Sequence, residues 1–239
     1  MRCALLHGFA GDPAVWDDVV AAWQLPEPPL AIALPGHGGG PVQPTWIENL
    51  AAIARAIAGC DVVVGYSLGA RVALGLVVGG HVAHGVLVGV NPGIADDERA
   101  SRREFDAAWS RLLRGEGIEA FIAAWEAQPL FASQAHAPPA RRASRREHRL
   151  ALDPEQLAQS LEVMGLAAMP DYASAIPAHR DRIALLAGAD DAKYVAISRR
   201  LPAVSFELIA GAGHDPTLEQ PVLLAQAIAR AVAALERTP

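Results

Sequence analysis

The sequence has few cysteines, few aromatic residues and no excess of positive charge. Two cysteines, Cys3 and Cys60, in 239 residues do not make a disulfide framework, so we expect reduced thiols in or near the core. The formal net charge is -6, whereas binding to nucleic acid requires a basic surface. These features argue against a disulfide-rich scaffold and against a nucleic-acid partner, and they favour a small-molecule site.

The sequence also lacks a long uninterrupted apolar segment. The most apolar stretch, from Val72 to Val90, is broken by His81, His84 and several glycines and is preceded by Arg71, so two separate elements explain it better than a membrane span. The first strand-like run starts at Cys3, which leaves no room for a signal peptide before it. We therefore expect a cytoplasmic protein that makes no membrane contact.

Short apolar runs alternate with longer helical patterns, and 52% of the residues are hydrophobic. This alternation predicts a single α/β domain with a mostly parallel, doubly wound sheet. The predicted strands are Cys3 to Leu6, Leu30 to Leu34, Val62 to Tyr66, Val86 to Val90, Ile183 to Ala187 and Phe206 to Ile209. The predicted helices between them are Trp46 to Ile57, Ser67 to Val78, Ala192 to Leu201 and Pro221 to Leu235.

The alternation breaks between Asn91 and Arg180, where the pattern is helical without a convincing strand. The helical segments are Ala100 to Leu113, Ile118 to Ala127, Pro139 to Arg149 and Pro154 to Met164. We interpret residues 93–179 as a helical cap inserted into a core formed by residues 1–92 and 180–239. The cap should lie over the carboxyl edge of the sheet, where ligands bind in open α/β sheets.

A glycine-flanked serine follows the strand Val62 to Tyr66. Gly65, Ser67 and Gly69 make the pattern G-x-S-x-G before a helix-compatible segment, which is the context of a nucleophile elbow. Glycines two residues before and after the serine relieve the crowding of a strained strand-to-helix turn. A glycine-rich turn with an incidental serine is the alternative, but the preceding strand favours a catalytic Ser67.

A serine hydroxyl needs a histidine that takes its proton and a carboxylate that orients the histidine. In proteins with this kind of elbow, the three residues follow along the chain in the order serine, acid, histidine. His214 comes directly after the last predicted strand and is the candidate base. Asp190 and Asp191 both follow the strand that starts at Ile183; the spacing favours Asp191 and leaves Asp190 as a solvated loop residue.

An oxyanion would need two backbone N–H groups. Leu68, directly after the serine, should supply one, and Phe9, in the His7-Gly8 loop after the first strand, should supply the other. Pro35 to Gly38 is predicted to be a structural turn near the site, and His37 is given no chemical step. We expect neither a metal nor a cofactor.

The chain resembles the 2-succinyl-6-hydroxy-2,4-cyclohexadiene-1-carboxylate synthases, lyases of menaquinone biosynthesis with the α/β-hydrolase fold. The resemblance covers nearly the whole length. It rests on LHGFAGD from Leu6, PGHG from Pro35, GYSLGAR from Gly65, the cap run from Arg99 to Trp109, WEAQPLFAS from Trp125 and GADDAKY from Gly188. The arginine after the elbow and the W-x-x-Q-P-x-F-A run in the cap are the more specific of these.

The resemblance implies elimination of pyruvate from an anionic cyclohexene dicarboxylate, with the serine–histidine pair abstracting a proton. It implies that Arg71, Arg102 and a third arginine, near the end of the third cap helix, bind carboxylates, and that Tyr66 and Trp125 belong to the pocket. The third arginine is Arg149 by alignment from the downstream side and Arg146 from the upstream side; Arg149 is preferred. Most of the other cap arginines should form a solvated helix face.

One position departs from the family, because Asp215-Pro216 follows the histidine where the family tends to have a small polar residue. Two other functions stay open: a carboxylesterase or C–C hydrolase that works through an acyl-enzyme, and a ligand-binding protein without catalysis. Arg71 speaks against the first and the full set of three candidate residues against the second. The sequence gives no indication of the oligomeric state.

Overall fold

The fold is built on a central six-stranded sheet with the strand order β2-β1-β3-β4-β5-β6. The computed structural model describes residues 1–23 and 27–237. Within these residues every pair of neighbouring strands is parallel. The strands are β1 Cys3–Leu6, β2 Leu30–Ile32, β3 Val62–Tyr66, β4 His84–Val88, β5 Ile183–Gly188 and β6 Ser205–Ile209. The predicted α/β class is confirmed.

All six predicted strands are present. β2 ends two residues earlier than predicted, β4 is shifted by two residues, β5 ends one residue later and β6 begins one residue earlier. The prediction placed the fourth strand at Val86 to Val90, but it begins at His84 and ends at Val88. The backbone leaves the extended conformation at Gly89, which has a φ of +62°. Because β4 ends there, Gly89 and the residues after it can turn over the carboxyl edge of the sheet, where Ser67 also lies.

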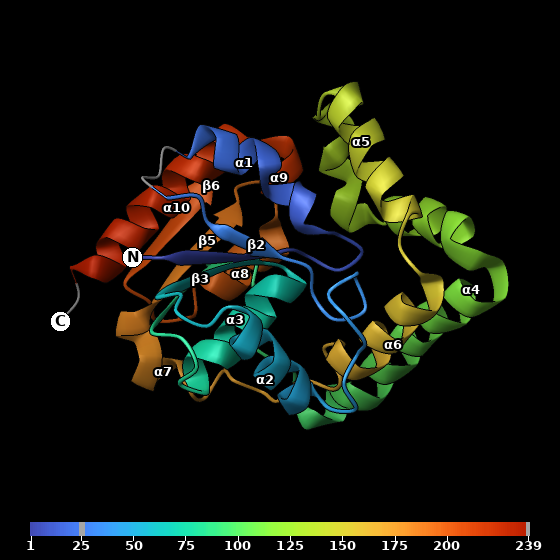
Figure 1. Cartoon of the computed structure of the whole chain (residues 1–239), viewed down its shortest axis with the longest axis horizontal. Helices are drawn as coiled ribbons and strands as arrows, with labels where there is room; N and C mark the ends of the chain where they lie inside the picture. The colour runs from blue at the N-terminus through green and yellow to red at the C-terminus, as the bar shows by residue number, and fades with distance from the viewer. Residues whose placement is uncertain (24–26, 238–239) are drawn as a thin grey trace.

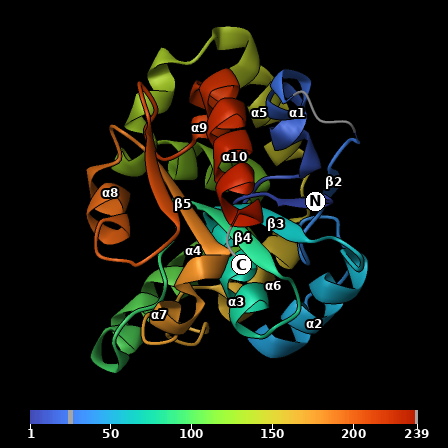
Figure 2. The same cartoon turned by 90° about the vertical axis from the view of Figure 1, so that its left-hand side faces the viewer.

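Helices cover both faces of the sheet (Figure 1). On one face lie α1 Asp17–Ala22 and α10 Pro221–Glu236, which pack against each other, and on the other lie α2 Trp46–Ala56 and α3 Leu68–Val78. In Figure 2, α10 runs lengthwise in front of the strands of the sheet. The short helix α8 Ala192–Ser198 packs against β5. Each face therefore has its own apolar core, formed by alternate residues of the same strands.

The apolar stretch from Val72 to Val90 divides into most of α3 and all of β4, which confirms the prediction of two separate elements. In the part of the chain that the structure describes, no helix is both long enough and apolar enough to cross a bilayer. Both cysteines are free and buried, as expected. Burial raises the pKa of the Cys3 thiol to about 11.

The segment between β4 and β5 is helical, and residues 99–164 of it project from one end of the sheet, whereas residues 176–179 lie beside α3 (Figure 1). It consists of α4 Arg99–Glu126, the 3-10 helix η3 Pro129–His136, α5 Pro139–Leu150, α6 Pro154–Met164 and α7 Ile176–His179. Two separate helices were expected where α4 runs, and Gly117, with a φ of +80°, interrupts α4 at the expected break. Leu113, Phe121, Leu157 and Leu161 form a small apolar core between α4 and α6.

Several short elements have no counterpart in the sequence-based assignment. These are η1 Pro13–Trp16, α1, η2 Asp96–Glu98, η3, α7, η4 Arg180–Arg182 and α9 Pro216–Glu219. Segments of three to eight residues are too short to display a helical period. α9 matters for the site, because it directly follows His214.

Candidate active site

Ser67 stands on a strained turn between β3 and α3. Its φ of +53° and ψ of -106° lie in a region that side-chain-bearing residues rarely adopt. A Cβ atom on Gly65 would lie 2.1 Å from the carbonyl oxygen of Gly69, and one on Gly69 would lie 2.2 Å from the carbonyl oxygen of Leu6. Both glycines are therefore required by direct contact with the backbone, which is the reason the sequence motif predicts.

The side chains of Ser67, His214 and Asp191 form a hydrogen-bonded row. His214 Nε2 lies 3.0 Å from Ser67 Oγ, and His214 Nδ1 lies 2.7 Å from Asp191 Oδ2. His214 is 3% exposed and Asp191 is 7% exposed, so water screens the pair weakly. The structure thus brings together the three residues that the sequence analysis selected from separate strand ends.

Asp191 rather than Asp190 faces the histidine. Asp190 is exposed, while the second carboxylate oxygen of Asp191 accepts a hydrogen bond from the backbone N–H of Tyr194. The same carboxylate thus caps α8 and contacts His214. The ring of Tyr194 lies over the histidine, with 4.4 Å between the ring centroids, a contact that the sequence did not reveal.

Two buried histidines hold the loop after β1. His37 Nε2 accepts a hydrogen bond from the backbone N–H of Ala10, and His7 Nε2 accepts one from the N–H of Leu34. Burial lowers the pKa of His7 to about 3 and that of His37 to about 4, so both rings are neutral and able to accept at pH 7. His37 is thus a structural residue of the site, as the sequence analysis expected.

Phe9 and Leu68, whose backbone N–H groups were expected to bind an oxyanion, line the same pocket as Ser67. Leu68 is the first residue of α3, and Gly69 N–H is already bonded to the carbonyl oxygen of His7. Among the loop and side-chain hydrogen bonds of the described residues, neither the Phe9 N–H nor the Leu68 N–H has an acceptor.

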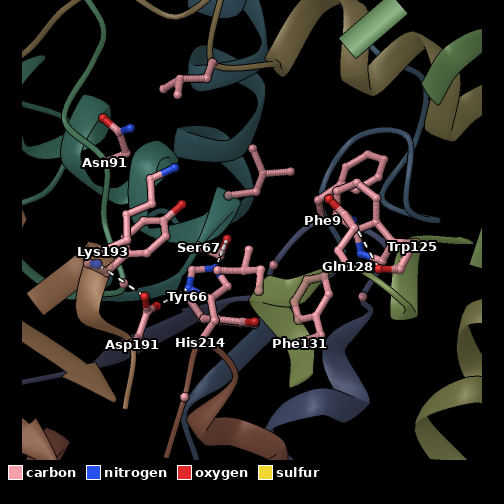
Figure 3. Close-up of a pocket in the computed structure, with 18 of the residues that line it drawn as sticks. Phe9, Tyr66, Ser67, Asn91, Trp125, Gln128, Phe131, Asp191, Lys193 and His214 are labelled. Atoms are coloured by element: carbon pink, nitrogen blue, oxygen red, sulfur yellow. Dashed lines mark hydrogen bonds and ion pairs between the residues drawn. The ribbon is translucent and has the colours of Figure 1, made fainter. Parts of the chain in front are cut away.

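The serine opens into a cavity of about 600 Å³ between the sheet edge and the helices of residues 99–164. Figure 3 shows Asp191, His214 and Ser67 in a row, with Phe9, Trp125, Gln128 and Phe131 to one side and Lys193 and Asn91 to the other. Tyr66 and Trp125, the two expected pocket aromatics, both line this cavity. The Trp125 indole N–H is buried without a partner in the described chain, which leaves it free for a ligand.

All three preferred arginines line the same cavity. Arg71 comes from α3 and donates to the carbonyl oxygen of Met164 at 3.0 Å, and burial, followed by the charge of Arg102, lowers its pKa to about 10. Arg102, on α4, is paired with the buried Asp106 at 3.0 Å. Two cationic groups beside one cavity favour an anion between them.

Arg149 and Arg146 occupy different environments although both approach Glu126. Arg149 is 5% exposed, bonds to Glu126 Oε1 at 2.9 Å and lines the cavity, and its buried Nε has no partner in the described residues. Arg146 has a side chain that is 42% exposed, pairs with the other oxygen of Glu126 and lies outside the lining of this cavity. Of the two alternatives, the structure therefore brings Arg149 to the site.

Several further residues of the site were missed. Arg145 and Lys193 line the cavity, and Asp215 and Glu219 are buried next to His214. Asp215 could have been noticed in the sequence, because the family tends to have a small polar residue at this position after the histidine. Its partner Arg145, however, lies 70 residues away in the sequence. The described residues contain no group of three or more histidine, cysteine or acidic side chains arranged to hold a metal ion.

A model described as the alpha/beta hydrolase family matches residues 4–227. The chain is 33% identical to the 2-succinyl-6-hydroxy-2,4-cyclohexadiene-1-carboxylate synthase of Enterobacter sp. (strain 638), over 94% of this chain and 89% of that protein. The chain belongs to the alpha/beta hydrolase family, among the relatives of this synthase. The synthase of Klebsiella pneumoniae is 32% identical over 95% of this chain and 92% of its own.

Solved structures agree with this family assignment. MenH from S. aureus superimposes with a TM-score of 0.90 and 27% identity, covering 99% of this chain and 95% of its own. A thermophilic esterase from Thermogutta terrifontis has a TM-score of 0.79 at 24% identity, covering 98% and 90%, which shows the shared fold alone. The family resemblance proposed from the sequence motifs is confirmed.

Proposed function

We propose that this protein is a lyase that eliminates pyruvate from 2-succinyl-5-enolpyruvyl-6-hydroxy-3-cyclohexene-1-carboxylate in menaquinone biosynthesis. The observation that carries the proposal is the joint lining of one cavity by Arg71, Arg102 and Arg149 above the Ser67–His214 pair. A hydrolase of neutral esters has no need of three guanidinium groups there. The names of the relatives, which are at least 32% identical over almost the whole chain, point the same way.

In this proposal Ser67, His214 and Asp191 act as a triad for proton abstraction. His214 takes the hydroxyl proton of Ser67, and Asp191 stabilises the imidazolium and keeps the ring in line. The activated serine oxygen removes a ring C–H proton from the substrate. The C–H electron pair forms a new ring double bond, and the existing ring double bond shifts to the carbon that carries the enolpyruvyl oxygen. The C–O bond to the enolpyruvyl group then breaks, and the departing enolate receives a proton and becomes pyruvate.

The arginines bind and orient the anionic substrate. Guanidinium groups stay charged and can bond to both oxygens of a carboxylate, which fixes the ring relative to Ser67. The unpartnered Nε of Arg149 and the unpartnered indole N–H of Trp125 are donors that a substrate oxygen would satisfy. The N–H groups of Phe9 and Leu68 stabilise negative charge that develops on a substrate oxygen in the transition state.

We further propose that residues 93–179 act as a cap over a core of residues 1–92 and 180–239, within one domain. The support is the position of the cavity, which is lined by core residues such as Ser67 and His214 and by residues from the helical segment such as Trp125 and Arg149. A cap of this kind excludes water from the reacting atoms, which suppresses hydrolysis in favour of elimination.

The decisive experiment supplies purified protein with the enolpyruvyl dicarboxylate and follows the release of pyruvate, with Ser67→Ala as the matched control. The wild type should release pyruvate rapidly, and Ser67→Ala should lose at least about 10³-fold in kcat while it still binds the substrate. Release of carboxylic acid from short esters without release of pyruvate would replace the lyase with a hydrolase. A Ser67→Ala variant that retains most of its activity would contradict the role of the triad.

A further inference from the structure

His214 lies in a short loop, Gly213 to Asp215, which we call the histidine loop, between β6 and α9. The carboxylate of Glu219 accepts hydrogen bonds from the backbone N–H groups of Gly213 and Asp215 and so holds this loop from below. Asp215 itself is 0% exposed and caps α9 by accepting from the N–H of Leu218. Two buried carboxylates, those of Asp215 and Glu219, therefore lie close to His214.

Side chains of the helical segment between β4 and β5 form hydrogen bonds with the histidine loop and with the start of α9. Arg145, on α5, donates from Nη1 to Asp215 Oδ2 at 2.7 Å and from Nη2 to Thr217 Oγ1 at 3.1 Å. From η3, Gln134 donates to Asp215, and Ser133 donates to Glu219. A Cβ atom on Gly213 would lie 2.0 Å from Ser133 Oγ, so the two parts are in direct contact.

The ion pair of Arg145 with Asp215 balances the charge of this region. Only 10% of the Arg145 side chain and none of the Asp215 side chain is exposed. Burial works to raise the pKa of Asp215, but the charge of Arg145 and the hydroxyl of Thr217 outweigh it and the pKa is lowered. The pKa of nearby Glu219 is raised, first by burial and also by the charge of Asp215. The charge of Arg149 also lowers the pKa of Asp215, but Arg145 has the larger effect and is the cation bonded to the carboxylate. Without Arg145, Asp215 would lose the cation that pairs with it directly.

We propose that Arg145 and Asp215 are a positioning pair for His214, through which helix α5 holds the imidazole in line between Ser67 and Asp191. The proposal rests on the proposed role of His214 as the base of the reaction. Among the hydrogen bonds and ion pairs of the described residues, none joins Arg145 or Asp215 to Ser67 or Asp191, so both act through the backbone of the histidine loop. The reactivity of Ser67 therefore depends on the position of α5.

The test compares Arg145→Met and Asp215→Asn with Arg141→Met as the matched control. Arg141 lies one turn earlier on α5 and pairs with Asp18 at 2.8 Å, so it also joins α5 to the core but does not reach the histidine loop. Asn at position 215 retains an oxygen that can cap α9. Two readouts are needed: kcat and KM for pyruvate release, and the rate at which a neutral fluorophosphonate labels Ser67, which requires no arginine.

Both test variants should lose the same factor in kcat and in labelling rate, about 10- to 100-fold, because a base displaced by a fraction of an ångström is a poor base. KM should stay within about threefold, Arg141→Met should change neither rate by more than about twofold, and Arg145→Lys should regain most of the labelling rate, since it restores the ion pair. These values follow from a role in positioning the base rather than in binding substrate.

Two results would overturn the proposal. One is a lower melting temperature with unchanged kcat and labelling at 25 °C, which would make the pair merely structural; the other is a raised KM with unchanged kcat. If Arg145→Met does not fold, Asp215→Asn is compared with Arg145→Lys. Slower labelling and a lower kcat for Asp215→Asn alone support the proposal, and unchanged rates for both variants overturn it. If the wild type is labelled quickly but releases no pyruvate, the proposed lyase activity fails, while the labelling rates still test the pair.

Discussion

Replacement of Arg149 by methionine should weaken the binding of a dicarboxylate without disturbing the serine. Arg149 is almost fully buried, lines the cavity and has a buried Nε without a partner in the described residues. Methionine retains much of the apolar stem and removes the charge. Glu126, which loses one of its two arginines, still has Arg146 as a partner. The change thus removes the cationic donor and leaves most of the packing.

The magnitude follows from the loss of a charge-assisted hydrogen bond in a desolvated pocket, which costs about 2 to 5 kcal/mol. Glu126 already takes one N–H of Arg149 at 2.9 Å and partly neutralises its charge, so the lower half of that range applies. We expect a loss of about 2 to 3 kcal/mol, or roughly 30- to 150-fold in kcat/KM for the enolpyruvyl dicarboxylate. The labelling rate of Ser67 by a neutral fluorophosphonate should stay within about twofold.

Arg146→Met is the matched control. Arg146 lies on the same helix and contacts the same glutamate, but its side chain is 42% exposed and lies outside the cavity lining. Its kcat/KM should fall by less than about threefold, in line with the small contribution of exposed ion pairs. An effect of Arg146→Met equal to or larger than that of Arg149→Met would refute the assignment of Arg149 as the carboxylate-binding residue. A matching loss in Ser67 labelling would refute a role in substrate binding.

Three further predictions concern the triad, the elbow and acid stability. Asp191→Asn should lower kcat by about 10⁴-fold and Asp190→Asn by less than about threefold; the reverse ranking in steady-state assays would move the acid by one residue. Gly65→Ala should reduce the free energy of unfolding by at least about 3 kcal/mol, because its methyl group would lie 2.1 Å from a carbonyl oxygen; an unchanged urea midpoint would contradict this. His7 and His37, with pKa values lowered by burial to about 3 and about 4, remain neutral in the folded chain while an unfolded chain protonates near pH 6.5. The contribution of both rings to the free energy of unfolding should therefore be fully present above about pH 6.5 and fall by roughly 1.4 kcal/mol per pH unit for each ring as the pH drops toward 4. Urea titrations in which the free energy of unfolding does not change between about pH 6.5 and 5 would be inconsistent with neutral buried rings.

The sequence by itself determined the elements whose residues repeat with a clear period or obey a local steric rule. The six apolar runs are long enough to identify buried strands. The glycines around Ser67 indicate a turn in which a Cβ atom has no space. The positions of His214 and Asp191 follow because the carboxyl ends of parallel strands meet at one edge of a sheet. The division of α4 was predicted as a gap between two helical patterns, and the structure places the interruption at Gly117, which has a positive φ.

Only the tertiary structure decided which residues meet across long sequence separations. The choice of Asp191 over Asp190 depends on the direction in which the chain leaves β5, and the choice of Arg149 over Arg146 depends on the rotation of α5 about its axis. The sequence favoured Asp191 by its spacing and Arg149 by its alignment but left both alternatives open, because one residue along α5 changes the face of the helix by about 100°. The contact of Arg145 with Asp215 joins residues 70 positions apart, and the burial that makes this ion pair matter exists only once the cap segment and the core have packed together.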